Sequence, residues 1–224
     1  MKIGVLGATG PAGGGLAARL ASVGYGVIAG SRDPARAEAA VRKMRERWGD
    51  RLGGLEPGSN ADAAAAELVV VGTQWEAAVP TAREHADALS AKVVVSMANG
   101  LTKVDREFRP VLPDEGSLTM EMQAAVPQAR VAAALQHIPA AALGDLDHAI
   151  DSDVIVCAAD DDARTTVLDL VAQIPDLRGF DGGSLANAVG IEAFAAVLLT
   201  INLRHKGKAS LRLVGVEPRP PSGL

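Results

Sequence analysis

Three glycines near the amino terminus have the spacing of a phosphate-binding turn. Positions 7, 10 and 13 give the pattern Gly-x-x-Gly-x-x-Gly. Glycine suits such a turn because a side chain would keep the backbone away from a pyrophosphate, while free N–H groups at the start of the following helix attract its negative charge. Thr9 stands where the commonest dinucleotide pattern has its second glycine, so the pattern alone is only moderately specific. The candidate pyrophosphate contacts are Gly7, Thr9, Gly10, Pro11 and Ala12.

The elements around this turn favour a nucleotide site over an ordinary loop. A short apolar run at residues 3–6 predicts a buried parallel strand that ends at Gly7. Apolar residues then recur at helical spacing from Leu16 to Val23, and Gly24 ends the predicted helix. A second strand follows and ends about twenty residues after the turn, which completes the strand, turn, helix and strand of a dinucleotide-binding unit.

The end of the second strand predicts which nucleotide binds. An NAD enzyme usually places Asp or Glu there to hold the ribose hydroxyls, whereas this chain has Ser31 and Arg32, followed by Arg36. A hydroxyl and two guanidinium groups can converge on a 2′-phosphate, which favours NADP. In the alternative interpretation both arginines are solvated surface charges, and Asp33 binds the ribose of NAD.

Further candidate contacts follow the other predicted strands, because the carboxyl ends of parallel strands line the ligand crevice of a doubly wound sheet. Thr73 and Gln74 follow a strand at residues 68–72 and are expected to contact the pyrophosphate or the nicotinamide ribose. Asn99 follows a strand at residues 92–96 in the same way. A sixth strand, at residues 130–135, leads into the loop that contains His137, and a lone loop histidine is more often structural than catalytic.

At this point the chain resembles the NADPH:F420 oxidoreductases, which exchange hydride between NADP and the deazaflavin coenzyme F420. The matching residues are Gly7-Ala-Thr-Gly10, Gly30-Ser-Arg32 with Arg36, Trp75-Glu76, Ile138-Pro139-Ala140-Ala141, Asp160-Asp161-Asp162, and Asn187 with Glu192. The resemblance implies NADP and F420 as the two substrates. It also implies that Ile138 packs against the nicotinamide, with Ala140 beside it as a cofactor contact and His137 as a positioning residue.

The second half of the chain departs from that family at several positions. Gln136 stands where the family often has a histidine, and polar positions beside the deazaflavin hold Val189, Ala193 and Ala195. These departures indicate either a weaker deazaflavin site or a changed acceptor. A basic cluster is expected either to attract the acidic tail of F420 or to offset the carbonyl end of the preceding helix. Its members are Arg204, His205, Lys206, Lys208 and Arg212.

The sequence lacks the residue patterns that several other reductases and hydrolases require. Tyr25 is the only tyrosine and has no lysine four residues later, which excludes a short-chain dehydrogenase. The four histidines share no metal-ligand spacing, and no serine lies in a nucleophile elbow. Hydride exchange between two organic cofactors fits best, since the protein then chiefly aligns two rings without a dedicated acid or base. An NADPH-dependent reductase of another small molecule and an NADP-sensing module without turnover remain the alternatives.

Composition limits the partners. The 224 residues carry a formal charge of −5, which argues against a nucleic-acid surface. The single Cys157 cannot form an internal disulfide. The longest apolar run, residues 193–201, is far too short to cross a bilayer. We therefore expect a cytoplasmic protein whose substrates are small molecules.

The predicted fold is α/β: a Rossmann-like, doubly wound and mainly parallel sheet with a small C-terminal α/β extension. Residues 1–142 form the expected NADP-binding domain, and residues 143–224 a small domain that contributes to the acceptor pocket and a homodimer interface. The homodimer rests on a helix at residues 185–203, whose apolar side chains cover most of its circumference and must be buried.

The other predicted elements are less directly tied to function. Helices are expected at residues 34–48, 76–89 and 117–126, and from Asp160 onward, with a brief alanine helix capped by Asn60. Strands are expected at residues 51–55, 153–158, 177–181 and 209–215. Residues 104–116 suggest a surface excursion, and residues 217–224 a proline-rich, frayed tail.

Overall fold

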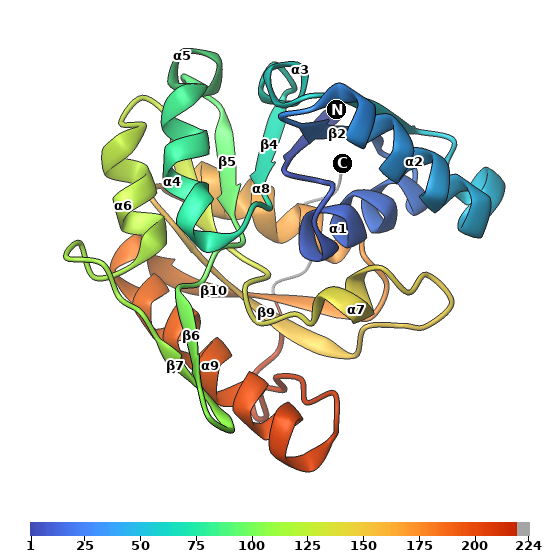
Figure 1. The fold of residues 1–224 in the computed structure, drawn as a ribbon. Helices are drawn as coiled ribbons and strands as arrows, with labels where there is room; N and C mark the ends of the chain where they lie inside the picture. Colours follow the sequence, from blue (N-terminus) through green and yellow to red (C-terminus); the bar gives the residue numbers. More distant parts are fainter. Residues whose placement is uncertain (219–224) are drawn as a thin grey trace.

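The main sheet has eight strands in the order β10-β9-β8-β5-β4-β1-β2-β3 in the computed structural model, which describes residues 1–218 (Figure 1). Its strands are β1 Lys2–Leu6, β2 Gly26–Ser31, β3 Leu55–Ser59, β4 Leu68–Val71, β5 Val93–Ser96, β8 Arg130–Ala133, β9 Ser152–Ala158 and β10 Leu177–Ser184. The six strands from β3 to β8 are parallel and have the Rossmann order, with the change of direction between β1 and β4. The predicted fold class is confirmed.

The sheet continues beyond the Rossmann strands. β9 pairs with β8 in the antiparallel direction, and β10 pairs with β9 in the parallel direction. One sheet therefore carries strands from both of the predicted domains.

Helices cover both faces of this sheet. The first face carries α1 Pro11–Ser22, α2 Pro34–Trp48 and α8 Asp161–Ala172, and the second carries α3 Asn60–Ala64, α4 Trp75–Glu84, α5 Ala86–Leu89 and α6 Leu118–Ala125. All four residues of β4 are buried, because both of its faces are covered. Alternate side chains of β1 divide between the layers: Ile3 and Val5 belong to the first core, and Leu6 to the second.

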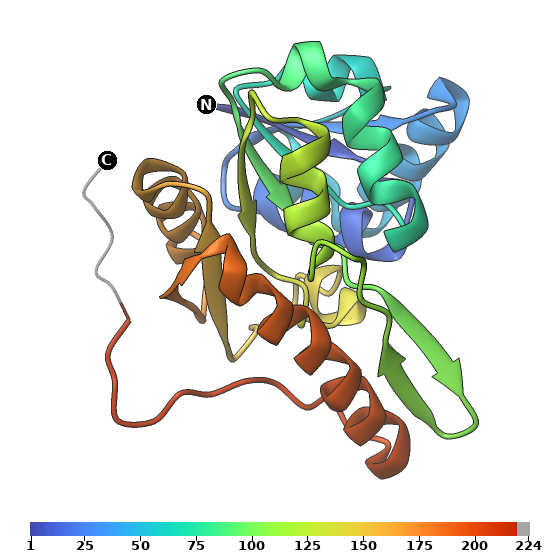
Figure 2. The same cartoon turned by 90° about the vertical axis from the view of Figure 1, so that its left-hand side faces the viewer.

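A third group of elements lies beside the sheet (Figure 2). It consists of a hairpin of β6 Leu101–Val104 and β7 Glu107–Pro110, the short helix α7 Ala140–Leu143, and the long helix α9 Ala188–His205. α9 packs along β7 and also contacts α6. α7 packs against α1.

Two predictions near β3 were wrong. Residues Gly49–Leu52 form a 3₁₀ turn, and the strand starts only at Leu55, where it pairs with Val27 of β2. The cap of α3 is Ser59, which forms a reciprocal capping box with Asp62. The side chain of Asn60 is therefore available for another contact, described below.

The expected surface excursion at residues 104–116 has no buried residue, and it contains β7 and the turn of the hairpin. Two further expectations need correction. The helix at residues 76–89 is divided into α4 and α5 at His85. Residues 209–215 form no strand; they lie along β9 through isolated hydrogen bonds, including one from Asp153 N to Leu211 O. Of the predicted tail, residues 219–224 lie outside the described part of the chain.

α9 differs from its prediction in burial and in length. Val197 is 50% exposed and Ile201 is 40% exposed, so this helix is not buried on all sides. With the turn before it, residues 185–205 form one helix long and apolar enough to cross a membrane by length and composition, with 33% of the window buried. The length inferred from the uninterrupted apolar run at residues 193–201 was therefore too short for the apolar helix. α9 is nevertheless part of the folded protein, since Glu192 is buried against α6.

Candidate active site

The glycine turn after β1 is shaped by close backbone approach. Gly7 has φ +76°, and a Cβ atom at this position would lie 2.5 Å from Cγ2 of Thr73. The Asn60 side chain holds the turn, because its Oδ1 accepts a hydrogen bond from Gly7 N at 3.2 Å. Only glycine fits here without moving Thr73, which itself follows β4.

The helix that follows presents free backbone donors. Gly10 is the N-cap of α1 and Pro11 is its first residue, and no side chain caps this end. The first N–H groups of a helix have no partner within it, so they are available to an anion. A Cβ at Gly13 would lie 2.9 Å from Gly7 O and 3.0 Å from Gly72 O, so glycine allows α1 to pack closely on the turn.

Ser31, Arg32 and Arg36 lie together at the end of β2, as the sequence predicted. Ser31 is buried, and its hydroxyl accepts a hydrogen bond from Asp33 N at 3.2 Å. Arg32 and Arg36 are exposed and form no ion pair with any residue between 1 and 218. Asp33 is the N-cap of α2, and its carboxylate accepts a hydrogen bond from Ala35 N at 3.0 Å. Asp33 also lines the cavity at this corner, where two guanidinium groups without an ion pair in the described part of the chain therefore accompany one capping carboxylate.

These residues line a first cavity of about 500 Å³. Its lining includes Gly7, Thr9, Gly10, Pro11, Ala12, Ser31, Arg32, Arg36, Asn60, Thr73 and Gln74. The cavity thus runs from the glycine turn to the arginines, over the point where the strand order reverses.

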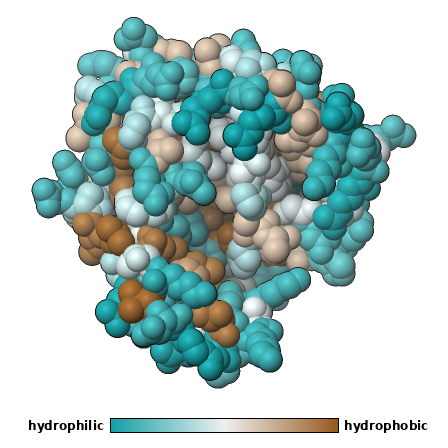
Figure 3. Space-filling view, in the orientation of Figure 1, coloured by the Kyte–Doolittle hydropathy of each residue, from teal (hydrophilic) through white to brown (hydrophobic). Residues whose placement is uncertain are grey.

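A second cavity, of about 450 Å³, adjoins the first and shares Ala12, Thr73 and Gln74 with it. The predicted residues Asn99, His137, Ile138 and Ala140 line it, together with Gln136, Pro139 and four residues of α9. Figure 3 shows a hollow near the centre of this face, with pale and brown surface around it. The structure therefore brings all the candidate site residues to two connected cavities.

The loop after β8 supplies one wall of the second cavity. Leu135 is buried with φ +68°, a left-handed conformation that is uncommon outside glycine. Asn99 Nδ2 donates a hydrogen bond to Gln136 O at 2.8 Å, which ties this loop to the segment after β5. Ile138 is 6% exposed and packs in the core that also contains α1.

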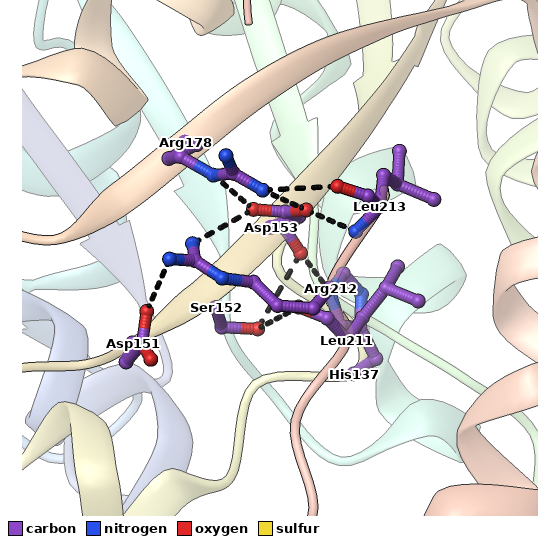
Figure 4. Close-up of polar contacts among 8 residues, drawn as sticks. All are labelled: His137, Asp151, Ser152, Asp153, Arg178, Leu211, Arg212 and Leu213. Carbon is purple, nitrogen blue, oxygen red and sulfur yellow. Dashed lines mark hydrogen bonds and ion pairs between the residues drawn. The ribbon is translucent and has the colours of Figure 1, made fainter. Parts of the chain in front are cut away.

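His137 is anchored on the far side of the loop (Figure 4). Its Nε2 lies 2.6 Å from the carbonyl oxygen of Asp153 in β9. Because a carbonyl oxygen only accepts, Nε2 carries the hydrogen and donates. Burial lowers the pKa of the His137 imidazole, although the bond to Asp153 opposes this effect. The ring is therefore neutral at neutral pH, and its other nitrogen is an acceptor.

Asp153 connects this anchor to the C-terminal segment (Figure 4). Its carboxylate is fully buried and accepts hydrogen bonds from Arg178 Nε at 2.6 Å and Nη2 at 2.7 Å. It also accepts from Leu213 N at 2.5 Å and from Arg212 Nη1 at 3.3 Å. Burial alone would raise the pKa of Asp153, but these donors lower it on balance. No pattern in the sequence predicts this cluster, because its members are distant along the chain.

Comparisons with known proteins agree with this geometry. The model of the family described as NADP oxidoreductase coenzyme F420-dependent matches residues 2–100. An F420-dependent NADP reductase of Methanocaldococcus jannaschii is 34% identical over 226 residues, covering 97% of this chain and 100% of the relative. The reductase of the same name from Methanothermobacter thermautotrophicus is 32% identical and covers 96% of each chain. The crystal structure of a protein described as an F420-dependent NADP reductase from Arthrobacter sp. FB24 superposes with a TM-score of 0.79 at 28% identity. The match covers 96% of this chain and 99% of that one.

The chain belongs to the F420-dependent NADP reductase family. The resemblance inferred from its motifs is confirmed.

In this family member, α9 forms the wall of the second cavity opposite the loop after β8. Ala195, Leu198, Leu199 and Asn202 line the cavity from this helix. Glu192 holds the helix in place, because its buried carboxylate accepts hydrogen bonds from Leu118 N at 2.8 Å and from Thr119 N and Oγ1 at 3.1 and 2.6 Å. Burial raises the pKa of this carboxyl, and the hydrogen bonds oppose the rise.

The departures from the family pattern fall unevenly around this reductase site. Of Val189, Ala193 and Ala195, only Ala195 lines the second cavity. The basic cluster is also divided: Arg212 pairs with Asp151 and Asp153, and Arg204 pairs with Glu107 of the hairpin. No group of three or more metal-ligating side chains occurs among residues 1–218.

Proposed function

We propose that this protein transfers hydride between NADP(H) and coenzyme F420. The observation that carries the proposal is the pair of connected cavities. The first extends from Arg32 and Arg36 to the glycine turn, and the second continues from it between Ile138 and α9. The relatives named above are F420-dependent NADP reductases. The protein is accordingly an oxidoreductase with NADP and F420 as its substrates.

The first cavity fits NADP. The free N–H groups at the start of α1 bind the pyrophosphate, with Thr9, Gly10, Pro11 and Ala12 around it. The glycine at position 7 lets the turn pack directly against Thr73. Ser31, Arg32 and Arg36 bind the 2′-phosphate. Thr73 and Gln74, which belong to both cavities, contact the nicotinamide end.

The second cavity positions the two rings. When bound together, NADP and the deazaflavin supply the hydride donor and acceptor, and the protein aligns them. Ile138 and Ala140 form an apolar wall, while Asn99 keeps the loop at Gln136 in place. Neutral, buried His137 is a positioning residue, and the mechanism needs no catalytic acid or base.

Mixing NADPH with F420 and following the deazaflavin absorbance tests the proposal. We expect turnover with the wild-type protein and a loss of at least tenfold in kcat/KM for Ile138→Asn, because a polar amide would replace the apolar wall. Ile138→Val, which keeps the wall apolar, is the matched control. Intact NADP binding without F420 binding or turnover would contradict the assignment of the acceptor.

A different small-molecule acceptor is the second candidate, and Ala195 favours it. This residue lines the cavity where the family tends to carry a polar side chain, so fewer hydrogen bonds are available to the deazaflavin from α9. A reductase of this kind would oxidise NADPH with another unsaturated compound while leaving F420 unchanged. An NADP-sensing module would bind the nucleotide and show no turnover with any acceptor.

The same proposal assigns roles to the parts of the chain. Residues 1–142 bind NADP, and residues 143–224 complete the acceptor pocket through α9. The exposed apolar side of α9 forms the interface of a homodimer. We place the protein in the cytoplasm, where both of its substrates are available.

A further inference from the structure

Four side chains among residues 1–218 have buried polar atoms without a hydrogen-bond partner, and three of them line the second cavity. The atoms at the cavity are Thr73 Oγ1, Gln136 Oε1 and Nε2, and His137 Nδ1. Gln136 is only 7% exposed and His137 only 5%, so solvent does not satisfy them freely. An unpaired buried polar group costs about 1–3 kcal/mol, and native proteins rarely keep several together.

The donor and acceptor character of His137 is fixed by the fold. Its Nε2 donates to the Asp153 carbonyl at 2.6 Å, so Nδ1 has no hydrogen and can only accept. The Asp153 main chain cannot move easily, because its N–H donates to Leu211 O at 2.8 Å and its carboxylate is held by Arg178 (Figure 4). The imidazole therefore offers one unpaired acceptor in a fixed position.

Gln136 offers both kinds of group. Its main chain is held by the hydrogen bond from Asn99 Nδ2 and by the left-handed turn at Leu135, whereas its side-chain amide has no partner. The amide oxygen accepts and the amide nitrogen donates. The main chain of the loop is therefore fixed, while three of its side-chain atoms remain unpaired within residues 1–218. A ligand could use one donor, Gln136 Nε2, and two acceptors, Gln136 Oε1 and His137 Nδ1.

We propose that Gln136 and His137 form a subsite that binds an amide edge, meaning a carbonyl oxygen beside an N–H group, on a ring in the second cavity. Gln136 Nε2 donates to the ligand carbonyl, and Gln136 Oε1 or His137 Nδ1 accepts from the ligand N–H. This inference rests on the proposed function, since two rings expected there carry such an edge. One is the carboxamide of the nicotinamide, and the other is the ring amide of the deazaflavin.

The variant Gln136→Met tests the subsite, because methionine keeps the size of glutamine and removes both polar groups. Isothermal titration would measure the binding of three probes: NADP, 2′-phospho-ADP-ribose, which lacks the nicotinamide, and F420. We expect roughly three- to tenfold weaker binding of one ring-containing ligand, as for a lost neutral hydrogen bond. Binding of 2′-phospho-ADP-ribose should not change. A loss confined to NADP identifies the carboxamide, and a loss confined to F420 identifies the deazaflavin.

The melting temperature of Gln136→Met provides a second readout. If Gln136 had a structural role, the substitution would lower the melting temperature. Removing unpaired buried polar atoms should leave the melting temperature of Gln136→Met unchanged or higher than that of the wild type. The matched control is Gln128→Met, at an exposed glutamine outside both cavities. Unchanged binding of all three probes, or a lower melting temperature with unchanged binding, would overturn the subsite.

The two proposals can fail separately. Wild-type turnover with F420 and unchanged binding by Gln136→Met would overturn the subsite alone. Absence of F420 turnover, combined with weaker NADP binding by the variant, would overturn the acceptor assignment and support the subsite.

Discussion

Arg32 and Arg36 are charged groups that the folded protein leaves unpaired beside a cavity. Neither guanidinium forms an ion pair within residues 1–218, although the neighbouring Asp33 is near in sequence. Asp33 instead caps α2. This division of roles favours NADP over NAD, because these two unpaired guanidinium groups stand beside the cavity while the Asp33 carboxylate already accepts a hydrogen bond from the start of α2.

Arg32→Ala is therefore expected to weaken NADP binding by about 1.5–3 kcal/mol, the range for hydrogen bonds to charged groups. That corresponds to roughly ten- to a hundredfold in Kd. NAD lacks the 2′-phosphate, so its affinity should barely change. Titration of both nucleotides measures the difference, and Arg42→Ala, which removes an exposed arginine of α2 outside the first cavity, is the control. Equal losses for both nucleotides would exclude the 2′-phosphate role.

His137 is expected to make the stability of the folded protein depend on pH. Burial lowers the pKa of its imidazole in the folded protein, so the unfolded chain binds more protons between the folded pKa and the ordinary value near 6.5. The stability that comes from neutral His137 is present above about pH 6.5 and is lost as the pH falls through the folded pKa.

We expect His137→Gln to lose less stability than the wild type between pH 7.5 and 5. Glutamine cannot be protonated in this range, and its Nε2 can still donate to Asp153 O. The contribution of one such group is at most about 1.4 kcal/mol per pH unit. Urea unfolding at a series of pH values measures it. Parallel pH curves for the two proteins would show that His137 does not titrate in this way.

At the scale of elements, the sequence predicted those whose ends carry local signals. α2 begins and ends as expected because Asp33-Pro34 starts it and Gly49 follows it. The strand predicted at residues 51–55 was wrong, since its position depends on pairing with β2, which the local sequence does not encode. Leu211 and Leu213 alternate with polar residues like a strand, but they meet Ser152 and Asp153 by single contacts.

Asp153 is the connection that holds the C-terminal segment against β9 and β10. Its buried carboxylate accepts from Arg178 on β10 and from Leu213 N in the segment. Asp153→Ala should lower the melting temperature by roughly 6–12 °C, because it removes the buried carboxylate that pairs with Arg178 and accepts from Leu213 N. Asp151→Ala should cost far less, because its exposed carboxylate pairs with Arg212 alone within residues 1–218. Equal melting temperatures for the two variants would refute this role.

At the scale of the whole molecule, the two cavities differ in how far the sequence could predict them. The first is built from residues 7–36 and the ends of β3 and β4, and the Rossmann order places these at one crevice. The second needs α9, whose position follows from Glu192 bonding to α6 and from packing on β7. Such contacts join residues more than seventy positions apart, so Gln136 and Asn202 could not be assigned to one pocket beforehand.

The exposed side of α9 carries two partly exposed apolar side chains, Val197 and Ile201. Val197 and Ile201 lie beside Phe108 of the hairpin in a surface hollow, and Figure 3 shows apolar side chains gathered in this lower part of the molecule. Fully burying an exposed valine is worth about 1.5–3 kcal/mol, so burying Val197, which is 50% exposed, gains roughly half of that in each subunit of a symmetric dimer. A charge at this position should therefore separate the subunits.

Val197→Asp is expected to convert a wild-type dimer into a monomer of 22.9 kDa at micromolar concentration. Light scattering coupled to size exclusion measures the mass directly. Val214→Asp is the matched control, because Val214 is 94% exposed and lies outside α9. Because α9 also lines the second cavity, the dimer contact should help to hold this wall of the cavity in place. In the monomeric variant, KM for the acceptor should therefore rise more than KM for NADPH. A monomer mass for the wild type would show that the apolar side of α9 serves no contact between copies of this chain.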